Sequence, residues 1–272
     1  MSLPLPEGQG QGVNEPLPYY LETGNHEGVI FEHAYRKRLP VMLKGPTGCG
    51  KTRFVEAMAA RLGRPLVTVS CHDDTSATDL IGRYLVRGAD TVWQDGPVTR
   101  AARQGAILYL DEVAEAREDV IVVLHSLSDH RRQLFVDRHD ETLVAHSAFQ
   151  LVASFNPGYQ RGFKELKPST RQRFVFLSFN YPPSDIETEI VAHESGVDVK
   201  IAKRLVSLAV KIRALEDTGA VDTVSTRSLV AAGMLISEGL EARSAFKAAV
   251  IEPLSDESTL SAALGDLVDL TL

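Results

Sequence analysis

The sequence predicts an α/β fold in which a parallel sheet with flanking helices precedes a small all-helical C-terminal domain. Before residue 180, five short apolar runs rich in β-branched residues alternate with stretches of helical periodicity. Strands that alternate with helices pair in parallel through crossover connections, and the helices then cover both faces of the sheet. From Ser184 onward only helical periodicity is present. These observations predict the sheet first and the helical domain second.

The composition of the 272 residues, 44% hydrophobic and 24% charged, is that of an ordinary globular protein. The net charge of −7 disfavours a protein whose main task is binding nucleic acid. Two cysteines, Cys49 and Cys71, exclude a disulfide framework and indicate a reducing compartment. The N-terminal residues lack a signal-peptide pattern, and no apolar run approaches the roughly 18 residues that span a bilayer. We therefore expect a cytoplasmic protein with neither membrane nor nucleic acid among its partners.

The elements of the α/β part follow one another in a regular order. Residues 1–20 are rich in Pro and Gly and are predicted to form an extended N-terminal arm. Gly28–Arg38 has the spacing of a short amphipathic helix, with Val29, Ile30, His33 and Ala34 on one side. A second helix is predicted over Thr52–Leu62. The five predicted strands are Leu39–Gly45, Arg64–Ser70, Ala106–Glu112, Ala148–Asn156 and Phe174–Phe179.

The C-terminal part is predicted to contain helices and no strand. The predicted helices are Asp185–Glu194, Val199–Glu216, Ser225–Glu238 and Glu241–Ile251. The boundary is expected near Tyr181-Pro182-Pro183, because consecutive prolines interrupt regular structure. The expected division is an arm over residues 1–20, an α/β nucleotide-binding domain over 21–182 and an α-helical lid domain over 183–272.

A phosphate-binding motif connects the first predicted strand to the next helix. Its residues are Gly45, Pro46, Thr47, Gly48, Cys49, Gly50, Lys51 and Thr52, and they fit G-x-x-x-x-G-K-[ST] in full. The glycines allow backbone N–H groups to turn toward phosphate oxygens, and the helix N-terminus adds its dipole. Lys51 is predicted to neutralise the β- and γ-phosphates of ATP, and Thr52 to ligate Mg²⁺. In this strand–loop–helix context the motif predicts a P-loop nucleoside triphosphatase.

Acidic and amide side chains follow two later strands. Asp111 ends the run ILYLDE and is predicted to hold Mg²⁺, while Glu112 could polarise the attacking water as a general base. A small-molecule kinase needs no such base, because its substrate is the nucleophile. Asn156 in SFNP lies at the carboxyl edge of the sheet, where ligands of such sheets bind. It is predicted to orient the water or to contact the γ-phosphate.

A pair of arginines precedes the fifth strand. Arg171 and Arg173 lie one residue apart in KELKPSTRQRFVFLSF. Arginine keeps its charge at any relevant pH and is poorly placed beside a buried strand unless an anion meets it. The sequence leaves open whether that anion belongs to this chain or to a neighbour, and whether Arg171 only forms a surface salt bridge.

Five features follow one another along the chain: GPTGCGKT, LYLDE, SFNP, the arginine pair, and STR at Ser225–Arg227. They occur in the order of an AAA+ ATPase, and the chain resembles that family over most of residues 40 to 230. Two further segments are similar to hairpin insertions of the MoxR branch, namely residues 79–98 and 131–150. The sequence segments CHDDTSATDLIGR and FNPGYQRGFKELKPSTRQRF most resemble the CbbQ/NirQ/NorQ subgroup.

The resemblance implies an oligomer, expected to be a hexamer, with ATP bound between subunits. A neighbour's arginine then contacts the γ-phosphate, and Arg173, directly before Phe174, is the first candidate, with Arg171 the second. Arg227 resembles the family's second sensor and is expected to reach the phosphates of its own subunit. Tyr84, Leu85 and Trp93 lie in the insertion that faces the pore in this family, although Trp93 could equally be the core of a self-packed hairpin.

The resemblance also implies partners. Members of the subgroup work with von Willebrand-type metal-site adaptor proteins, so a CbbO-like adaptor is expected. Activation of inhibited Rubisco is the first expected function, and maturation of nitric oxide reductase is the alternative. A nucleic-acid motor or transcription activator of the same superfamily is disfavoured by the acidic balance and by the lack of an appended DNA-binding helix pair.

Overall fold

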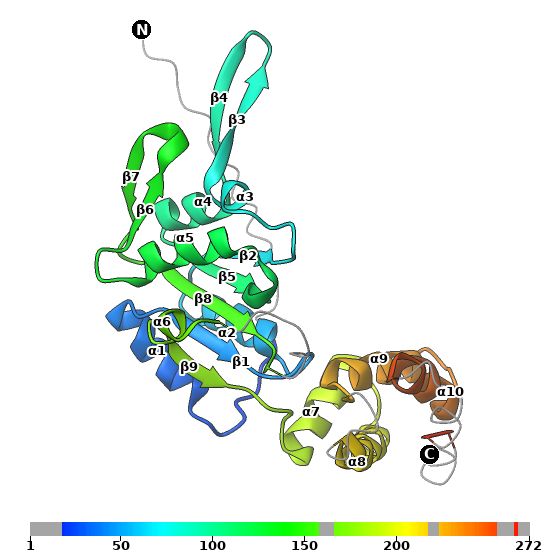
Figure 1. Cartoon of the computed structure of the whole chain (residues 1–272). Helices are drawn as coiled ribbons and strands as arrows, with labels where there is room; N and C mark the ends of the chain where they lie inside the picture. Colours follow the sequence, from blue (N-terminus) through cyan, green and yellow to red (C-terminus); the bar gives the residue numbers. More distant parts are fainter. Residues whose placement is uncertain (1–17, 158–165, 217–222, 255–263, 266–272) are drawn as a thin grey trace, which may run out of the picture.

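The computed structural model describes residues 18–157, 166–216, 223–254 and 264–265. Its sheet contains five parallel strands in the order β2-β5-β8-β1-β9 (Figure 1). The strands are β1 (Val41–Lys44), β2 (Leu66–Ser70), β5 (Ile107–Asp111), β8 (Gln150–Phe155) and β9 (Val175–Ser178). Each lies within a predicted strand, and the parallel sheet followed by helices confirms the predicted fold class.

Helices cover both faces of this sheet because the central strands are apolar on both sides. Met42, Leu108 and Leu151 face a core shared with α4 (Pro97–Gln104) and α5 (Glu118–Ser128). Their strand neighbours face a second core, which includes residues of α1 (Glu27–Lys37) and α2 (Lys51–Arg61). This alternation with a period of two is that of a sheet buried on both faces.

The predicted apolar side of α1 is correct only at Ala34, which is buried, and wrong at the other three positions. Val29 and Ile30 are 46% and 38% exposed, whereas Phe31 is fully buried. Phe31 meets the ring of Phe54 on α2 edge-on, with the ring centroids 5.4 Å apart. Packing an aromatic side chain against α2 buries more apolar surface than the β-branched pair offers, and this sets the rotation of the helix.

Both predicted insertions are antiparallel hairpins, as expected. The first joins β3 (Gly82–Arg87) to β4 (Asp90–Asp95) and follows α3 (Ala77–Ile81). The second joins β6 (Gln133–Val136) to β7 (Glu141–Val144) through a 3-10 turn, Asp137–His139. They project from the α/β part on the side away from the helical part (Figure 1).

The two hairpins are held together by side chains. The Trp93 ring stacks on His139 of the second hairpin, with centroids 5.0 Å apart and planes at 7°. Tyr84 meets the same indole edge-on, and its hydroxyl lies 3.3 Å from His139 Nδ1. Trp93 is therefore neither fully free nor the core of a self-contained hairpin, because it packs between the two insertions.

The C-terminal part is helical and has a core of its own. Its elements are α7 (Ser184–Ser195), α8 (Val199–Glu216), α9 (Thr226–Ser237), α10 (Ala242–Phe246), a π-helical turn (Lys247–Ile251) and a 3-10 turn (Glu252–Leu254). No strand occurs among its described residues, as predicted. In the described part of the chain, no helix is both long and apolar enough to cross a membrane. The exact domain boundary at residues 182 and 183 stays a prediction.

Candidate active site

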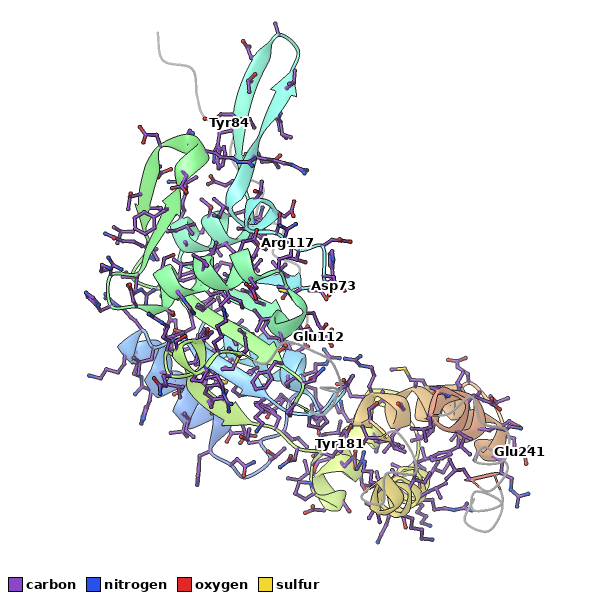
Figure 2. All side chains as sticks on the ribbon, in the orientation of Figure 1. Asp73, Tyr84, Glu112, Arg117, Tyr181 and Glu241 are labelled. Atoms are coloured by element: carbon purple, nitrogen blue, oxygen red, sulfur yellow. The ribbon has the colours of Figure 1, made fainter. Side chains whose placement is uncertain are left out.

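A cavity of about 720 Å³ lies where the α/β part meets the helical part. Its polar wall comes from the phosphate loop and from the carboxyl ends of β5 and β8, which the register of the parallel sheet places at one edge. Its opposite wall comes from α7, α9 and the segment that precedes α1. Figure 2 shows Glu112 at this edge of the sheet, facing the side of the helical part. The cavity is large enough to enclose a nucleotide.

The phosphate loop folds as it does because two of its glycines have no room for a side chain. A Cβ on Gly45 would collide with the Phe179 carbonyl at the end of β9. Gly48 has a φ of +69°, and a Cβ there would lie 2.6 Å from Cβ of Ser225. Gly48 therefore lets the N-terminus of α9 approach the loop. Gly50 is the N-cap of α2, so the loop leads directly into the helix N-terminus, where anions bind.

The Lys51 ammonium group is buried and fully engaged. Its Nζ donates hydrogen bonds to the carbonyls of Gly45 (2.9 Å) and Pro46 (2.8 Å) and to Oδ1 of Asn156 (2.7 Å). Burial lowers the pKa of Lys51, and the nearby carboxylates of Asp111 and Glu112 oppose this shift. The three oxygen acceptors around Nζ match the three N–H donors of the ammonium form.

Asn156 connects this lysine to the predicted general base. Its Nδ2 donates to Oε1 of Glu112 (3.2 Å) and to Oγ1 of Thr47 (3.1 Å). Glu112 itself has a φ of +55°, a conformation that costs a non-glycine residue about 1–3 kcal/mol. Its backbone N–H is held by Ser154 Oγ (3.2 Å). The backbone strain and both hydrogen bonds fix the Glu112 carboxylate beside the phosphate loop.

Asp111 is oriented by two residues that the sequence analysis treated only as strand residues. Tyr109 donates its hydroxyl proton to Asp111 Oδ1 (2.8 Å), and Ser154 donates to the same oxygen. Burial raises the pKa of Tyr109, so the phenol stays protonated as a donor. Among the described residues, no donor reaches Asp111 Oδ2. Asp111 and Thr52 both line the cavity, and their carboxylate and hydroxyl groups offer hard oxygen ligands that suit Mg²⁺.

Cys49 contributes a small buried side chain to the loop. Burial raises the pKa of its thiol, and the charge of Lys51 only partly offsets this effect. A thiol held in its neutral form is a poor nucleophile. Cys49 therefore shapes the loop.

The apolar wall of the cavity was missed by the sequence analysis. Its residues are Tyr19, Tyr20, Leu21, Ile190, Val230 and Met234. Tyr19 and Tyr20 end the segment predicted as an extended arm, yet Tyr19 stacks on His193 of α7 with ring centroids 3.6 Å apart. Tyr20 donates to the buried carboxylate of Glu27 (2.8 Å). Two adjacent tyrosines after a proline-rich stretch were the available signal for a docked segment.

The structure brings Arg227 to the same cavity. It is the second residue of α9 and lies on the cavity wall with the phosphate-loop residues. Ser225 caps the helix by accepting from the Ser228 N–H (3.1 Å). The capped N-terminus holds Arg227 against the loop, where its charge can meet phosphate oxygens.

Arg171 and Arg173 lie elsewhere. They end and follow the short helix α6 (Pro168–Arg171), are exposed, and do not line the cavity of their own chain. The guanidinium of Arg171 lies over the Phe176 ring at 5.8 Å. Their backbone N–H groups bond within the α6 turn, but neither guanidinium forms a hydrogen bond or ion pair with any residue in the described ranges. Thr170, which precedes Arg171, is buried, and its hydroxyl forms a hydrogen bond with His125 Nε2 (2.8 Å).

Comparison with known proteins agrees with this geometry. Residues 40–174 match the AAA domain of the dynein-related subfamily, and residues 187–271 match the CbbQ/NirQ/NorQ C-terminal family. The chain is similar in fold to a crystal structure of a proposed ATPase from Cytophaga hutchinsonii. The TM-score is 0.53 at 15% identity, covering 91% of this chain and 90% of the other.

Three curated relatives are similar over nearly their whole length. Protein NorQ of Paracoccus denitrificans is 57% identical over 95% of both chains. Denitrification regulatory protein NirQ of Pseudomonas aeruginosa is 53% identical over 95% of this chain and 99% of its own. Protein CbbQ of Hydrogenophilus thermoluteolus is 54% identical over 91% and 92%. The chain therefore belongs to the CbbQ/NirQ/NorQ family of AAA+ ATPases.

Proposed function

We propose that the protein works as an oligomeric motor whose ATP turnover requires Arg173 of a neighbouring subunit and remodels a protein target. One observation carries the proposal. The cavity gathers Lys51, Glu112, Asn156 and Arg227, whereas Arg173 is exposed outside it and has no anionic partner in the described part of the chain. An arginine that lacks an anion in its own subunit is suited to an ATP γ-phosphate in the next one.

Within one subunit the described groups have distinct tasks. The backbone amides of the phosphate loop, together with Lys51 and Arg227, would bind the phosphates of ATP. The apolar wall of the cavity would bind its adenine ring. Thr52 and Asp111 would hold Mg²⁺, which supplies positive charge at the β- and γ-phosphates. Glu112 would accept the proton of a water whose oxygen bonds to the γ-phosphorus as the β–γ bridging bond breaks. Asn156 forms hydrogen bonds with both Glu112 and Lys51, so it would hold the general base and the lysine ammonium group in fixed positions relative to each other.

The assembly and its partner are part of the same proposal. A hexamer is expected, with Arg173 as the residue that enters the neighbouring site and Arg171 as the second candidate. The first projecting hairpin offers a polypeptide the exposed side chains of Tyr84 and Val86 on one face and that of Val92 on the other. A von Willebrand-type metal-site adaptor is the expected intermediary to the target.

Rubisco reactivation is the target that we propose first, and nitric oxide reductase maturation is the alternative. The 54% identity to CbbQ supports the first, and the 57% and 53% identities to NorQ and NirQ support the second to the same degree. A paired assay separates them. The ATPase and its adaptor are added to inhibitor-bound Rubisco and, separately, to immature nitric oxide reductase, and the gain of each activity is measured.

The oligomeric mechanism is tested by turnover per subunit as a function of protein concentration. We expect turnover to rise with concentration until assembly is complete, because each site needs a neighbour. Arg173→Ala is expected to lower turnover about 10³-fold while ATP binding persists. Full turnover in a monomeric preparation would contradict the proposal.

A further inference from the structure

Tyr181 lies in the link between β9 and α7, where the chain passes from the sheet to the helical part (Figure 2). Its hydroxyl donates a hydrogen bond to the carbonyl of Thr47 in the phosphate loop, at 3.1 Å. The same hydroxyl accepts a hydrogen bond from Thr223 Oγ1, at 3.2 Å. Thr223 lies two residues before the N-cap of α9. One phenol oxygen therefore bridges the phosphate loop to the segment that leads into α9.

The ring of Tyr181 makes a second connection. The guanidinium of Arg213, on α8, lies over this ring at 4.0 Å from its centroid. Arg213 donates to both carboxylate oxygens of Glu187, each at 2.8 Å, and its Nε donates to the Val224 carbonyl at 2.7 Å. The Glu187 side chain is fully buried and that of Arg213 is 14% exposed. Two parallel hydrogen bonds fix the orientation of the Arg213 guanidinium relative to the Glu187 carboxylate. A shift of the Tyr181 ring that moves Arg213 would therefore also move Glu187.

The Glu187 carboxylate reaches the residue beside Arg227. Thr226 Oγ1 donates to Glu187 Oε1 at 2.6 Å, and Thr226 is buried as the first residue of α9. Arg227 follows it on the cavity wall. The contacts therefore run from the Thr47 carbonyl through Tyr181, Arg213 and Glu187 to the first turn of α9. Because these groups are buried or half-buried, displacing one of them displaces the others.

We propose that Tyr181 is a positioning residue that sets Arg227 over the phosphate loop through its hydroxyl bond to Thr47 and its ring contact with Arg213. The proposal rests on the role of Arg227 in the proposed function. It adds the device that places this arginine: the phenol joins the loop, which belongs to the α/β part, to the helix that carries Arg227. Nucleotide in the loop and the orientation of the helical part are then coupled at one side chain.

Removing the Tyr181 hydroxyl alone tests this coupling. Tyr181→Phe keeps the ring and its contact with Arg213 and loses the bonds to Thr47 and Thr223. We expect kcat for ATP hydrolysis to fall about three- to tenfold, the scale of the one net hydrogen bond to Thr47 that reaches the phosphate loop, with KM changed less than twofold. The midpoint of thermal unfolding should stay close to that of the wild type. The matched control is Tyr35→Phe, a half-buried tyrosine of α1 whose hydroxyl has no hydrogen bond in the described ranges.

The decisive comparison uses Arg227→Ala with and without Tyr181→Phe. If the phenol acts through Arg227, the double variant turns over at the rate of Arg227→Ala alone, within about twofold. If the two losses multiply, Tyr181 acts independently of Arg227 and the inference is overturned, while the proposed function stands. If Arg227→Ala leaves turnover unchanged, the role assigned to Arg227 fails, and the inference fails with it.

Discussion

The nucleotide cavity and the arginine pair before β9 differ in whether their charged side chains have hydrogen-bond partners within the chain. In the cavity, Lys51 has three acceptors, and the Asp111 and Glu112 carboxylates each have donors from neighbouring side chains. Arg171 and Arg173 are exposed, and no carboxylate pairs with them in the described part of the chain. The chain therefore provides partners for the first set of charges, and we propose that the second set meets an anion of another subunit.

This difference separates what a single chain can do from what needs an assembly. In the proposed mechanism, the cavity of one chain supplies the groups that bind the phosphates, Glu112 as the base, and Asn156 as the donor that positions Glu112. The transition state of phosphoryl transfer also needs positive charge near the γ-phosphate, which arginines supplied in trans provide in related reactions. Substitutions in the cavity should therefore change the chemical step or the stability of the single chain. Substitutions of the arginine pair should change only the ATP turnover of the assembly.

The largest expected effect comes from the base. Glu112→Gln keeps the hydrogen bond from Asn156 and removes the proton acceptor, so hydrolysis should fall about 10²- to 10⁴-fold with ATP still bound. Turnover and equilibrium binding of ATP measure the two properties. Glu115→Gln is the control, because Glu115 lies three residues on and outside the cavity wall. Loss of ATP binding in Glu112→Gln would show that Glu112 holds the nucleotide and is not the base.

Stability should depend on the buried pair and not on the exposed arginine. Arg213→Met leaves the Glu187 carboxylate buried without its partner and should lower the free energy of unfolding by about 3–5 kcal/mol. Arg173→Met should change it by less than about 0.5 kcal/mol, because the side chain is exposed. Denaturant unfolding measures both. Equal losses would mean that Arg173 has a partner within its own chain.

A smaller, pH-dependent effect on stability is expected at Glu27, which bonds to two residues of the cavity wall, Tyr20 and Thr23. Glu27 is buried and accepts bonds from Tyr20 and from the backbone and hydroxyl of Thr23. Burial alone would raise the pKa of Glu27, but these bonds outweigh burial and lower it. A depressed folded-state pKa stabilises the protein above the usual glutamate pKa, and this stabilisation disappears as the pH falls through the folded-state value.

Glu27→Gln should therefore cost about 1–3 kcal/mol of unfolding free energy at pH 7. The difference from the wild type should shrink as the pH falls below about 4.5, where the unfolded glutamate takes up a proton, and should vanish below the folded-state pKa, where Glu27 is neutral in both states. Unfolding midpoints measured from pH 7 to pH 3 give the comparison. A difference that is constant over this range would contradict a role for the charged form.

The smallest effect is expected where the two hairpins meet. Arg103 on α4 bonds to Asp95 of the first hairpin (2.8 Å) and to Glu141 of the second. All three side chains are partly exposed, so Arg103→Ala should cost only about 0.2–1 kcal/mol. Basal turnover should not change, because the site lies away from the cavity. A large loss of turnover would show that the hairpins and the cavity are coupled.

The sequence predicted those parts of the fold that short segments encode. GPTGCGKT, ILYLDE and SFNP each carry their chemistry within a few residues after a strand, and parallel pairing necessarily brings the ends of those strands together. The hairpins were predictable for the same reason, since local alternation and turn residues define them. The wrong face assigned to α1 shows the limit: Phe31 is buried by a partner, Phe54, that lies on another helix.

The missed residues act through contacts between distant segments. Tyr20 reaches Glu27 and the cavity, and Tyr181 reaches Thr47 across 134 positions of the chain. Ser154 has the pattern of an ordinary strand residue, and only the register of β5 against β8 brings it to Asp111, whereas Tyr109 reaches Asp111 from two residues earlier on the same strand. No local pattern marks Ser154 or Tyr181, because their role depends on which elements pack together.

The central claim is that one subunit's Arg173 completes the site of the next. Mixing Glu112→Gln with Arg173→Ala tests it directly, because the first variant lacks the base but offers the arginine, and the second lacks the arginine but keeps the base. With subunit exchange verified by energy transfer between labelled chains, turnover of the mixture should exceed the sum of the separate activities. The control, Glu112→Gln/Arg173→Ala mixed with Arg173→Ala, should show no gain. A mixture that never exceeds the sum, at any ratio, would contradict the account.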